Sequence, residues 1–493
     1  MTLTEQDAAR IRTAADEVIA QYHLPGIAIG VVHGDDVIFC EAFGHADIES
    51  RTPFTIDRRQ RIASISKTMV GLCAMALIDE GKLALDARVV DLLPDVRFDG
   101  PAESMTVRHL LTHTSGIGEA PTRARLLDAA NPDRAAVGEP PGDFAAMYPD
   151  GVVVEVAPGE KWAYCNNGYA LLGEIVVRAA GDDLQSTMQR RIFGPLGMTS
   201  TDIEDADDPR ITTCYHRAPN EDTRFQLERA GVTVREEQPV DGHNIRGKFT
   251  SDFNKSMRAA GGVQSTLPDM LKYASALLRG GAGIVRPATY DAMIAPQYCP
   301  DARLVNWGLA FARAPLPVAG QPPSAWRTFI GHGGAYFGGW NSHIDVLREE
   351  GIGIVQHMNI MLDSPAAVFR RIHCAVLGTI EEPLAARQTE AQVLATAPGI
   401  YELPMPGPLT NFRPASRVGR IHITADDGEL TLESRWGDWK HGVRLVPCDP
   451  GDPAFFAVPT QSGTGYLALT RDPTGNVTGL RFDDLVHMHK RQD

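Results

Sequence analysis

Three short clusters along the chain carry side chains whose types and spacing could perform acyl-transfer chemistry. They are Ser64-Ile65-Ser66-Lys67, Tyr164-Cys165-Asn166 and His332-Gly333-Gly334-Ala335. Together they supply a hydroxyl nucleophile, an amine, a phenol, a carboxamide and a glycine-rich strand. A covalent serine enzyme needs such groups to attack a carbonyl, to move protons and to hold its substrate. Each cluster also has a purely structural alternative.

Ser64 and Lys67 stand at the start of a nearly all-apolar run that continues to Ile78. The pattern predicts a helix that ends at Gly81, and a helix that is apolar on every face is normally buried. Lys67 follows Ser64 by three residues, which places both side chains on one face, about 5–6 Å apart at their Cβ atoms. Burial disfavours the charged form of the lysine, so its amine can accept the serine proton. The alternative is an N-capping serine beside a lysine that reaches solvent, and S-x-x-K alone favours that alternative.

The second cluster lies in a predicted loop, just before an amphipathic helix at 170–180. Tyr164 and Asn166 are two residues apart, so in an extended loop both side chains point to the same side. A phenol there can relay protons to a leaving group, and a carboxamide can bind a substrate amide as donor and acceptor. The alternative is an Asx-type cap on the helix, which Asn167 could serve equally well.

The third cluster is predicted to lie on a strand among other strand-like runs. Gly333 and Gly334 leave this strand without side chains, so we expect a substrate backbone to approach it closely. The N–H groups of Ala335 and Ser64 would then form an oxyanion hole. His332 could orient the substrate or stabilise a charge. The alternative is a turn histidine in a glycine-rich hairpin.

The order S-x-x-K, Y-x-N and H-x-G resembles the superfamily of serine β-lactamases and penicillin-binding proteins. The H-x-G form is most similar to its D-aminopeptidase and esterase branches. Segments 106–116, 193–198 and 260–266 also resemble recurring segments of that superfamily, and the resemblance spans most of the first 380 or so residues. It implies acyl transfer through a covalent serine ester.

The three clusters and the resemblance imply one mechanism. Lys67 takes the proton of Ser64, and Ser64 attacks an ester or amide carbonyl. Tyr164, coupled to Lys67, protonates the departing group, and the same pair activates water to release the acid. Asn166 and His332 position the acyl part of the substrate.

The substrate class follows from the third motif. β-Lactamases and cell-wall penicillin-binding proteins usually carry a lysine at the position of His332, and a mostly neutral imidazole binds a carboxylate less well. We therefore expect an esterase or a D-stereospecific amidase or peptidase. The alternatives are an acyltransferase, transesterase or peptide-cyclising thioesterase, then a β-lactamase, then an inactive binding module. Retention of Ser64, Lys67, Tyr164 and Asn166 argues against an inactive module.

Composition limits the partners and the compartment. The chain has 43% hydrophobic and 22% charged residues, a balance typical of soluble globular proteins. Its net charge of −15 argues against nucleic acid or an anionic membrane as a partner. The first residues lack the apolar core of a secretory signal, and the cysteines form no C-x-x-C pair, so we expect reduced thiols in a cytoplasm. The expected partner is a small-molecule or peptide ester or amide, and a homodimer is one possible assembly.

No cofactor and no metal are expected. His109 and His113 have the i, i+4 spacing of metal ligands, but Leu110 occupies the position of the catalytic glutamate in a zincin motif. A packed pair of histidines that serves the fold is the favoured interpretation.

The pattern of elements predicts an α+β fold. An opening hairpin at 27–32 and 37–43 is expected to join three strand-like runs between 326 and 358 in one antiparallel sheet. A helix at 364–379 should pack back on this sheet. Helices between 64 and 278 should form an all-helical subdomain, with the active site at the junction of the two.

Three regions divide the chain: a β-lactamase-like catalytic domain at 1–385, a polar linker at 386–398 and a small antiparallel β-barrel at 399–493. The last region resembles the lipocalin-like C-terminal domains of many relatives. Segments 119–150 and 226–257 fit no element and could be a lid or surface insertions.

Within the barrel region, turn residues separate short strand-like runs. Residues 420–424 should pair with 429–433, and 465–470 with 476–482, across turns that each contain Gly and Asp.

Overall fold

The computed structural model describes residues 3–118, 151–203, 208–218, 224, 237–247, 257–318, 321–336, 338–362, 365–379, 388–403, 419–435, 437–460, 463–482 and 486–491. Segment 119–150 lies outside the described residues. Of segment 226–257, only 237–247 and Met257 are described.

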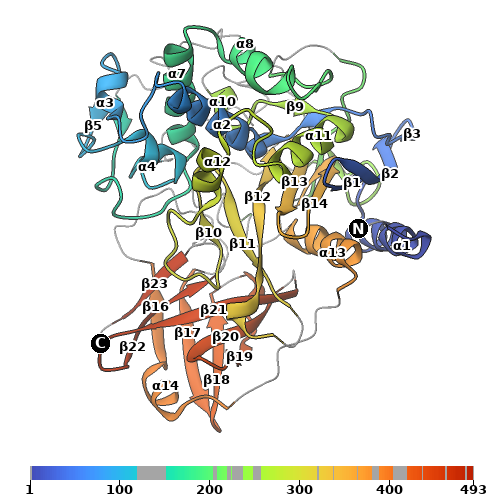
Figure 1. Ribbon diagram of the computed structural model, residues 1–493. Helices are drawn as coiled ribbons and strands as arrows, with labels where there is room; N and C mark the ends of the chain where they lie inside the picture. Colours follow the sequence, from blue (N-terminus) through green and yellow to red (C-terminus); the bar gives the residue numbers. More distant parts are fainter. Residues whose placement is uncertain are drawn as a thin grey trace.

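An antiparallel sheet of eight strands forms the centre of the larger part of the molecule (Figure 1). Its order is β10-β11-β12-β13-β14-β1-β2-β3, so the opening hairpin lies beside the late strands, as predicted. Ile27 of β1, for example, pairs with Met358 of β14. The bounds are β1 Gly26–His33, β2 Asp36–Asp47, β3 Thr52–Pro53, β10 Asn306–Trp307, β11 Ala312–Leu316, β12 Arg327–Tyr336, β13 Trp340–Leu347 and β14 Ile352–Met358.

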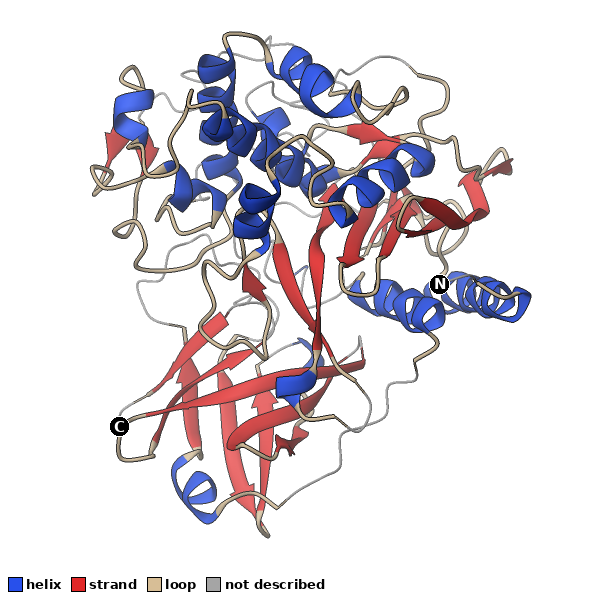
Figure 2. Cartoon of the chain, viewed as in Figure 1, coloured by secondary structure: helices blue, strands red, loops and turns tan. Residues whose placement is uncertain are grey.

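Helices cover both faces of this sheet (Figure 2). On one face, α1 (Glu5–Tyr22) packs against α13 (Ala366–Leu377), the helix predicted to return to the sheet. On the other face, α11 (Leu267–Leu278) packs against β1, β13 and β14. Every residue of β14 is buried, as expected for a strand covered on both sides.

Helix α2 (Ser66–Asp79) is the centre of the helical subdomain. Every residue from Ser66 to Leu77 is buried, which confirms the prediction from its apolar sequence. Gly81, with a φ of 71°, follows its end as predicted. Around it lie α3 Val89–Leu92, α4 Val107–Leu111, α7 Asn166–Ala180, α8 Leu184–Met188, the π-helical turn η2 Gln189–Phe193, α10 Arg258–Gly261 and α12 Pro287–Ile294.

Short strands and 3-10 turns connect these elements. The strands are β4 Gln60–Arg61 with β9 Gln264–Ser265, β5 Phe98–Asp99 with β6 Val152–Val153, and β7 Tyr215–His216 with β8 Ile245–Arg246 and β15 Ile360–Met361. The 3-10 turns are η1 Ala63–Ile65, η4 Pro323–Ala325 and η5 Gly437–Trp439. The pairing of β4 with β9 fixes the chain directly before η1.

A closed antiparallel barrel follows, drawn in orange and red in Figure 1. Both hairpins predicted in it are confirmed, and apolar side chains such as Ile423, Leu432 and Leu467 fill its core. Helix α14 (Ala391–Thr396) precedes it, and Val393 packs into the same core. The strands are β16 Gly399–Glu402, β17 Ile421–Asp426, β18 Glu429–Ser434, β19 Val443–Asp449, β20 Asp452–Thr460, β21 Gly463–Arg471, β22 Val477–Phe482 and β23 Val486–Lys490.

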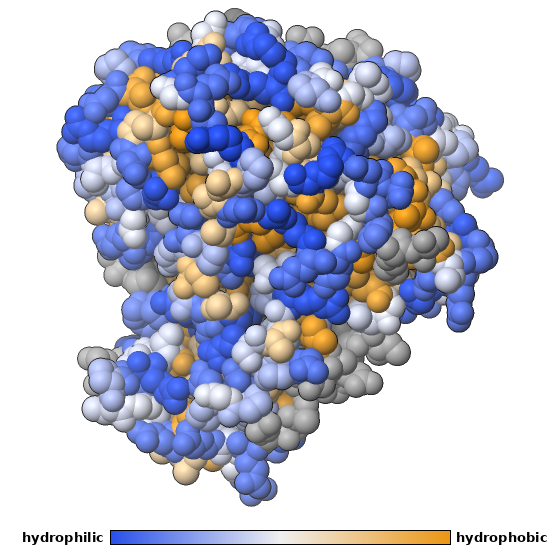
Figure 3. Space-filling model, viewed as in Figure 1, coloured by the Kyte–Doolittle hydropathy of each residue, from blue (hydrophilic) through white to orange (hydrophobic). Residues whose placement is uncertain are grey.

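The visible surface is largely hydrophilic, with separate apolar patches (Figure 3). Among the described helices, none combines the length and the apolar character that a membrane crossing requires. All seven cysteines are free thiols.

Candidate active site

Ser64 lies in a tight turn that leads directly into helix α2. The turn is η1, and α2 begins at Ser66, so Ser64 occupies the start of one continuous helical segment, as predicted. Ala63 adopts a φ of 47°, in a region that costs a non-glycine residue about 1–3 kcal/mol. Ala63 and Ile65 are buried, whereas Ser64 is partly exposed. The turn therefore presents one hydroxyl to solvent from a strained and otherwise buried backbone.

Lys67 is fully buried beside this hydroxyl. Its Nζ lies 3.0 Å from Oγ of Ser64 and also donates to the carbonyl oxygen of Ala260. The rings of Tyr164 and Tyr169 lie 5.1 and 5.6 Å from Nζ. The alternative of a lysine that reaches solvent is therefore wrong. In its neutral form, the amine could accept the serine proton across the contact of 3.0 Å.

The second cluster lies where a loop enters helix α7. Tyr164 is in the loop, and its ring lies 6.0 Å from that of His332. Asn166 is the first residue of α7 and is partly exposed. The cap considered for Asn167 is instead made by Cys165, whose Sγ accepts the N–H of Gly168 at 3.2 Å. The amide of Asn167 donates to the carbonyl of Gly118 at 2.9 Å.

The glycines of the third cluster make room for neighbouring protein atoms. A Cβ on Gly334 would lie 2.1 Å from the carbonyl oxygen of Ile62 and 3.4 Å from Cβ of Ala63. This glycine therefore lets the turn that contains Ser64 pack directly on β12. Gly333 is exposed, yet a Cβ there would still lie 3.3 Å from Nδ1 of His343. The expected reason for these glycines is thus incomplete.

One edge of β12 is open beside the candidate site. β11 pairs with β12 only from Arg327 to Gly331, whereas β13 pairs with it as far as Tyr336. In the described part of the chain, residues 332–336 therefore have no strand partner on the β11 side. An extended substrate segment could add to this edge through main-chain hydrogen bonds. Ala335 lies within this stretch, and β12 packs against η1.

Aromatic side chains from separate parts of the chain form a wall beside Tyr164. The ring of Trp307 lies 5.5 Å from those of Trp162 and His332, 6.2 Å from Tyr164 and 5.1 Å from His113. Both tryptophans are buried, at 5% and 9% exposure for Trp307 and Trp162. Neither indole N–H meets an acceptor among the described residues, and such a buried donor costs about 1–3 kcal/mol. The two unsatisfied indole N–H groups therefore lower the stability of the folded protein.

The two histidines with metal-like spacing serve the fold, as predicted. Nδ1 of His109 accepts the N–H of Thr106 at 3.1 Å. Nδ1 of His113 accepts the N–H of Cys165 at 3.0 Å, which ties α4 to the loop that carries Tyr164.

A second ionisable cluster lies on the opposite face of β12 and β13. His343 Nε2 lies 2.7 Å and His373 Nε2 3.5 Å from Oδ2 of Asp345. Burial alone would raise the pKa of the Asp345 carboxyl. The nearby imidazoles of His343 and His373 together outweigh this effect, so the pKa lies below the ordinary value. Burial lowers the pKa of His373 to about 4. A Cβ on Gly331 would lie 2.1 Å from Oδ1 of Asp345, so this glycine admits the carboxylate.

The three ligand atoms of this second cluster lie within 4.8 Å of one another, which is spacing that a metal ion could use. The hydrogen bond between His343 and Asp345 accounts for the contact without one. We assign the cluster to the support of β12.

Comparison with known proteins identifies the family. A family model described as Beta-lactamase matches residues 11–376, which is most of the chain. This chain belongs to the Beta-lactamase family. Esterase EstB of Burkholderia gladioli is 30% identical over 355 residues, which cover 66% of this chain and 86% of EstB. A D-aminopeptidase of Cereibacter sphaeroides (strain ATCC 17023) is 29% identical over 272 residues, which cover 55% of this chain but only 46% of that protein.

Solved structures show the same β-lactamase-like fold. The octameric penicillin-binding protein homologue from Pyrococcus abyssi superposes with a TM-score of 0.62 at 20% identity, over 98% of this chain and all of that one. D-Amino acid amidase from Ochrobactrum anthropi SV3 gives a TM-score of 0.56 at 22% identity, over 76% of this chain and 99% of the amidase. The first match extends over the C-terminal barrel.

Within this member of the Beta-lactamase family, the structure joins the predicted residues in one chain of contacts. Ser64 contacts Lys67, Lys67 lies against the ring of Tyr164, and that ring lies near His332. Sequence reasoning missed Trp307, which is far along the chain from the other clusters and belongs to no motif. Trp162, two residues before Tyr164, was the only local signal of an aromatic wall.

Proposed function

We propose that this chain is a serine hydrolase of the esterase or D-amino-acid amidase type, which cleaves its substrate through an acyl-enzyme on Ser64. The observation that carries the proposal is the 3.0 Å contact between the buried Lys67 amine and the partly exposed Ser64 hydroxyl. Family membership supports the reaction class. The similarity to an esterase and to D-aminopeptidases supports the substrate class.

The reaction begins with proton transfer from Ser64 to neutral Lys67 while Oγ attacks the carbonyl carbon. The N–H groups of Ser64 and Ala335 stabilise the negative oxygen of the tetrahedral intermediate. Tyr164 then protonates the departing alcohol or amine as its bond to the carbonyl carbon breaks. Water, deprotonated by the Tyr164–Lys67 pair, attacks the acyl-enzyme, and the proton returns to Oγ as the acid leaves.

Substrate recognition involves Asn166, His332 and the open edge of β12. Asn166, partly exposed at the start of α7, offers a donor and an acceptor to a substrate amide. The main chain at 332–336, Gly333 and Gly334 included, offers hydrogen bonds to an extended acyl part. His332 replaces the lysine with which β-lactamases bind a carboxylate, so an ester or a D-configured amide fits better than a β-lactam.

We also infer a cytoplasmic setting and a small-molecule or peptide ester or amide as substrate. Seven free thiols and a net charge of −15 support this setting. The barrel strands follow one another in chain order around the closed sheet, which supports a lipocalin-like classification.

The test is pre-steady-state turnover of p-nitrophenyl acetate with intact-mass analysis. Wild type is expected to release about one equivalent of p-nitrophenol in a burst and to gain one acetyl group on Ser64. Ser64→Ala should lose both. Ser66→Ala is the matched control, because the Ser66 hydroxyl already donates to the Ala63 carbonyl at 2.6 Å, and it should keep the burst. A burst that survives in Ser64→Ala would contradict the proposal.

A further inference from the structure

One short segment of the catalytic part is anchored on the barrel. The guanidinium of Arg303 lies 2.7 Å from Asp449 of β19 and 2.9 Å from Asp452 of β20. It also lies 4.1 Å from the ring centre of Phe455, also in β20. Asp301, two residues before Arg303, holds the same guanidinium at 2.7 Å. These contacts fix the direction of a half-buried arginine at the junction of the two domains.

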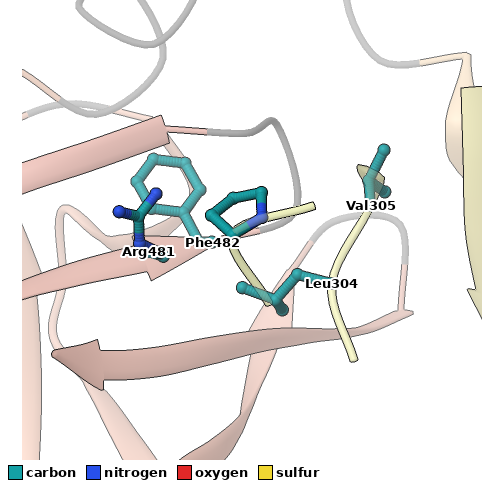
Figure 4. Close-up of a pocket in the computed structure, with 5 residues that line it drawn as sticks. Leu304, Val305, Arg481 and Phe482 are labelled. Carbon is teal, nitrogen blue, oxygen red and sulfur yellow. The ribbon is translucent and has the colours of Figure 1, made fainter. Parts of the chain in front are cut away.

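Apolar packing strengthens this anchor. Leu304 is 3% exposed and lies in a cluster with Phe455 and Tyr466 of the barrel. Trp326 packs against Tyr466 with 4.5 Å between ring centres and an angle of 58° between the ring planes. At the edge of the junction, Leu304 and Val305 line a small cavity together with Arg481 and Phe482 of β22 (Figure 4). The segment is therefore seated on the barrel over several strands.

The same segment reaches the aromatic wall within three residues. Trp307 follows Leu304 closely, and its ring lies 5.5 Å from His332 and 6.2 Å from Tyr164. In Figure 1, β10, which contains Trp307, lies between the helices and the barrel. The barrel thus contacts one end of a segment whose other end borders the proposed active site.

Hydrogen bonds leave little freedom between the two ends. Asn306, 4% exposed, donates to the carbonyl of Leu304 at 3.2 Å and accepts from Arg313 of β11 at 2.9 Å. The N–H of Trp307 donates to the carbonyl of Tyr298 at 2.9 Å. These bonds connect the anchored end of the segment to Trp307, so a displacement at Arg303 can reach the Trp307 ring.

We propose that the barrel determines the acyl specificity of the site, because its contact with Arg303 and Leu304 positions Trp307 as the wall against which the acyl group packs. This inference rests on the proposed function. The class of substrate is an ester or amide whose acyl part carries an aromatic or other bulky apolar group, since two indoles and a phenol line the wall. Trp307 is a specificity residue, and Arg303 is a positioning residue that acts through it.

The test compares two substrates on each protein. For the double variant Asp449→Asn/Asp452→Asn, the kcat/KM for p-nitrophenyl phenylacetate relative to p-nitrophenyl acetate is expected to fall by about tenfold or more. The ratio does not depend on the fraction of folded enzyme. Trp307→Leu should lower the ratio in the same direction. The control is Glu429→Gln, which removes an exposed barrel ion pair with Arg444 and should leave the ratio unchanged.

An unchanged ratio in both the double variant and Trp307→Leu would overturn the inference. A lower ratio in Trp307→Leu alone would overturn the role of the barrel. Loss of the proposed function has a different signature, namely full turnover of both esters by Ser64→Ala, whatever the ratio.

Discussion

Two buried ionisable clusters lie on opposite faces of strands β12 and β13, and the two clusters differ in the charge of the groups that meet. On the face behind the site, the Asp345 carboxylate meets the imidazoles of His343 and His373. On the site face, the amine of Lys67 donates to two neutral oxygens, those of Ser64 and Ala260. The first arrangement pairs an acid with bases, whereas the second places a base against a hydroxyl.

This difference explains why one cluster supports the fold and the other can react. A buried carboxylate that is hydrogen-bonded to the His343 imidazole and lies 3.5 Å from that of His373 is stable where it is, and breaking the group would leave a buried charge. A buried amine next to a partly exposed hydroxyl gains little stability but can exchange a proton with it. The strand between them, β12, is shaped by both, through Gly331 on one face and Gly334 on the other.

The largest expected contrast comes from removing one base on each face. Lys67→Met should lower kcat/KM by about a thousandfold or more, with little loss of stability, because a buried amine is replaced by an apolar side chain. His373→Gln should keep activity within a few fold and lower the free energy of unfolding by about 1–3 kcal/mol. Turnover assays and urea unfolding of both variants check this. If Lys67→Met kept its activity and His373→Gln lost it, the roles assigned to the two clusters would be wrong.

Tyr164 and Tyr169 allow a matched test on the site face, because both rings lie near Nζ of Lys67. Tyr164→Phe should lower kcat by about a hundredfold or more, since the phenol is assigned to proton transfer. Tyr169 is fully buried and donates to the carbonyl of Leu111 at 3.1 Å. Tyr169→Phe should therefore cost about 1 kcal/mol of stability and little kcat. Equal losses of kcat in the two variants would contradict the assignment of Tyr164 to proton transfer.

Two glycines of β12, on the face that carries Asp345 and His343, allow a test of how tightly that cluster is packed. Gly331→Ala would place Cβ 2.1 Å from Asp345 Oδ1 and 2.0 Å from the carbonyl oxygen of Ile344, and should destabilise by about 1–3 kcal/mol. Gly333→Ala meets only His343, at 3.3 Å, and should cost clearly less. Thermal unfolding of the two variants checks the order. If Gly333→Ala were the less stable protein, the contacts assigned to Gly331 would be wrong.

The last expected effect is a gradual pH dependence of stability. Burial lowers the pKa of His373 to about 4 and that of His357 to about 3. In the unfolded chain these imidazoles bind protons near their ordinary pKa of about 6.5, so between these values the unfolded state holds more protons. Stability should therefore fall as pH drops from about 6.5 towards 4, by up to about 1 kcal/mol per pH unit for each histidine.

Urea unfolding at several pH values, with His357→Gln and His373→Gln for comparison, checks this slope. Each variant should show a shallower decline than wild type. A wild-type stability that stays flat over the window would show that the two histidines are not buried in their neutral form.

The features that could be predicted from the sequence are those that depend on local residue patterns. The all-apolar run after Ser64 predicted a buried helix, and alternation with turn residues predicted the sheet and barrel hairpins. The motif residues Ser64, Lys67 and Tyr164 were selected because their types and order are specific, and the structure brings the three side chains together. Contacts between distant segments were not predictable. Trp307 reaches the site through tertiary packing. The need for glycine at position 331 becomes apparent only when the adjacent Asp345 carboxylate is known.

One error and one incomplete prediction have the same origin. The cap of α7 was sought among asparagines, but the thiol of Cys165 performs it because its Sγ lies within reach of the Gly168 N–H. The second reason for Gly334, its close packing on Ile62 and Ala63, was not predictable because the neighbours of a strand face cannot be identified from sequence. The open edge of β12 arises where β11 ends, which is a property of the sheet.

Covalent labelling tests the central claim most directly, because it asks whether the Lys67 amine makes Ser64 the nucleophile. Wild type and Lys67→Met would be treated with a fluorophosphonate, and the adduct mapped by peptide mass spectrometry over time. We expect a single adduct on Ser64, formed about a hundredfold more slowly in Lys67→Met. An adduct on another residue, or equal rates in the two proteins, would contradict the account.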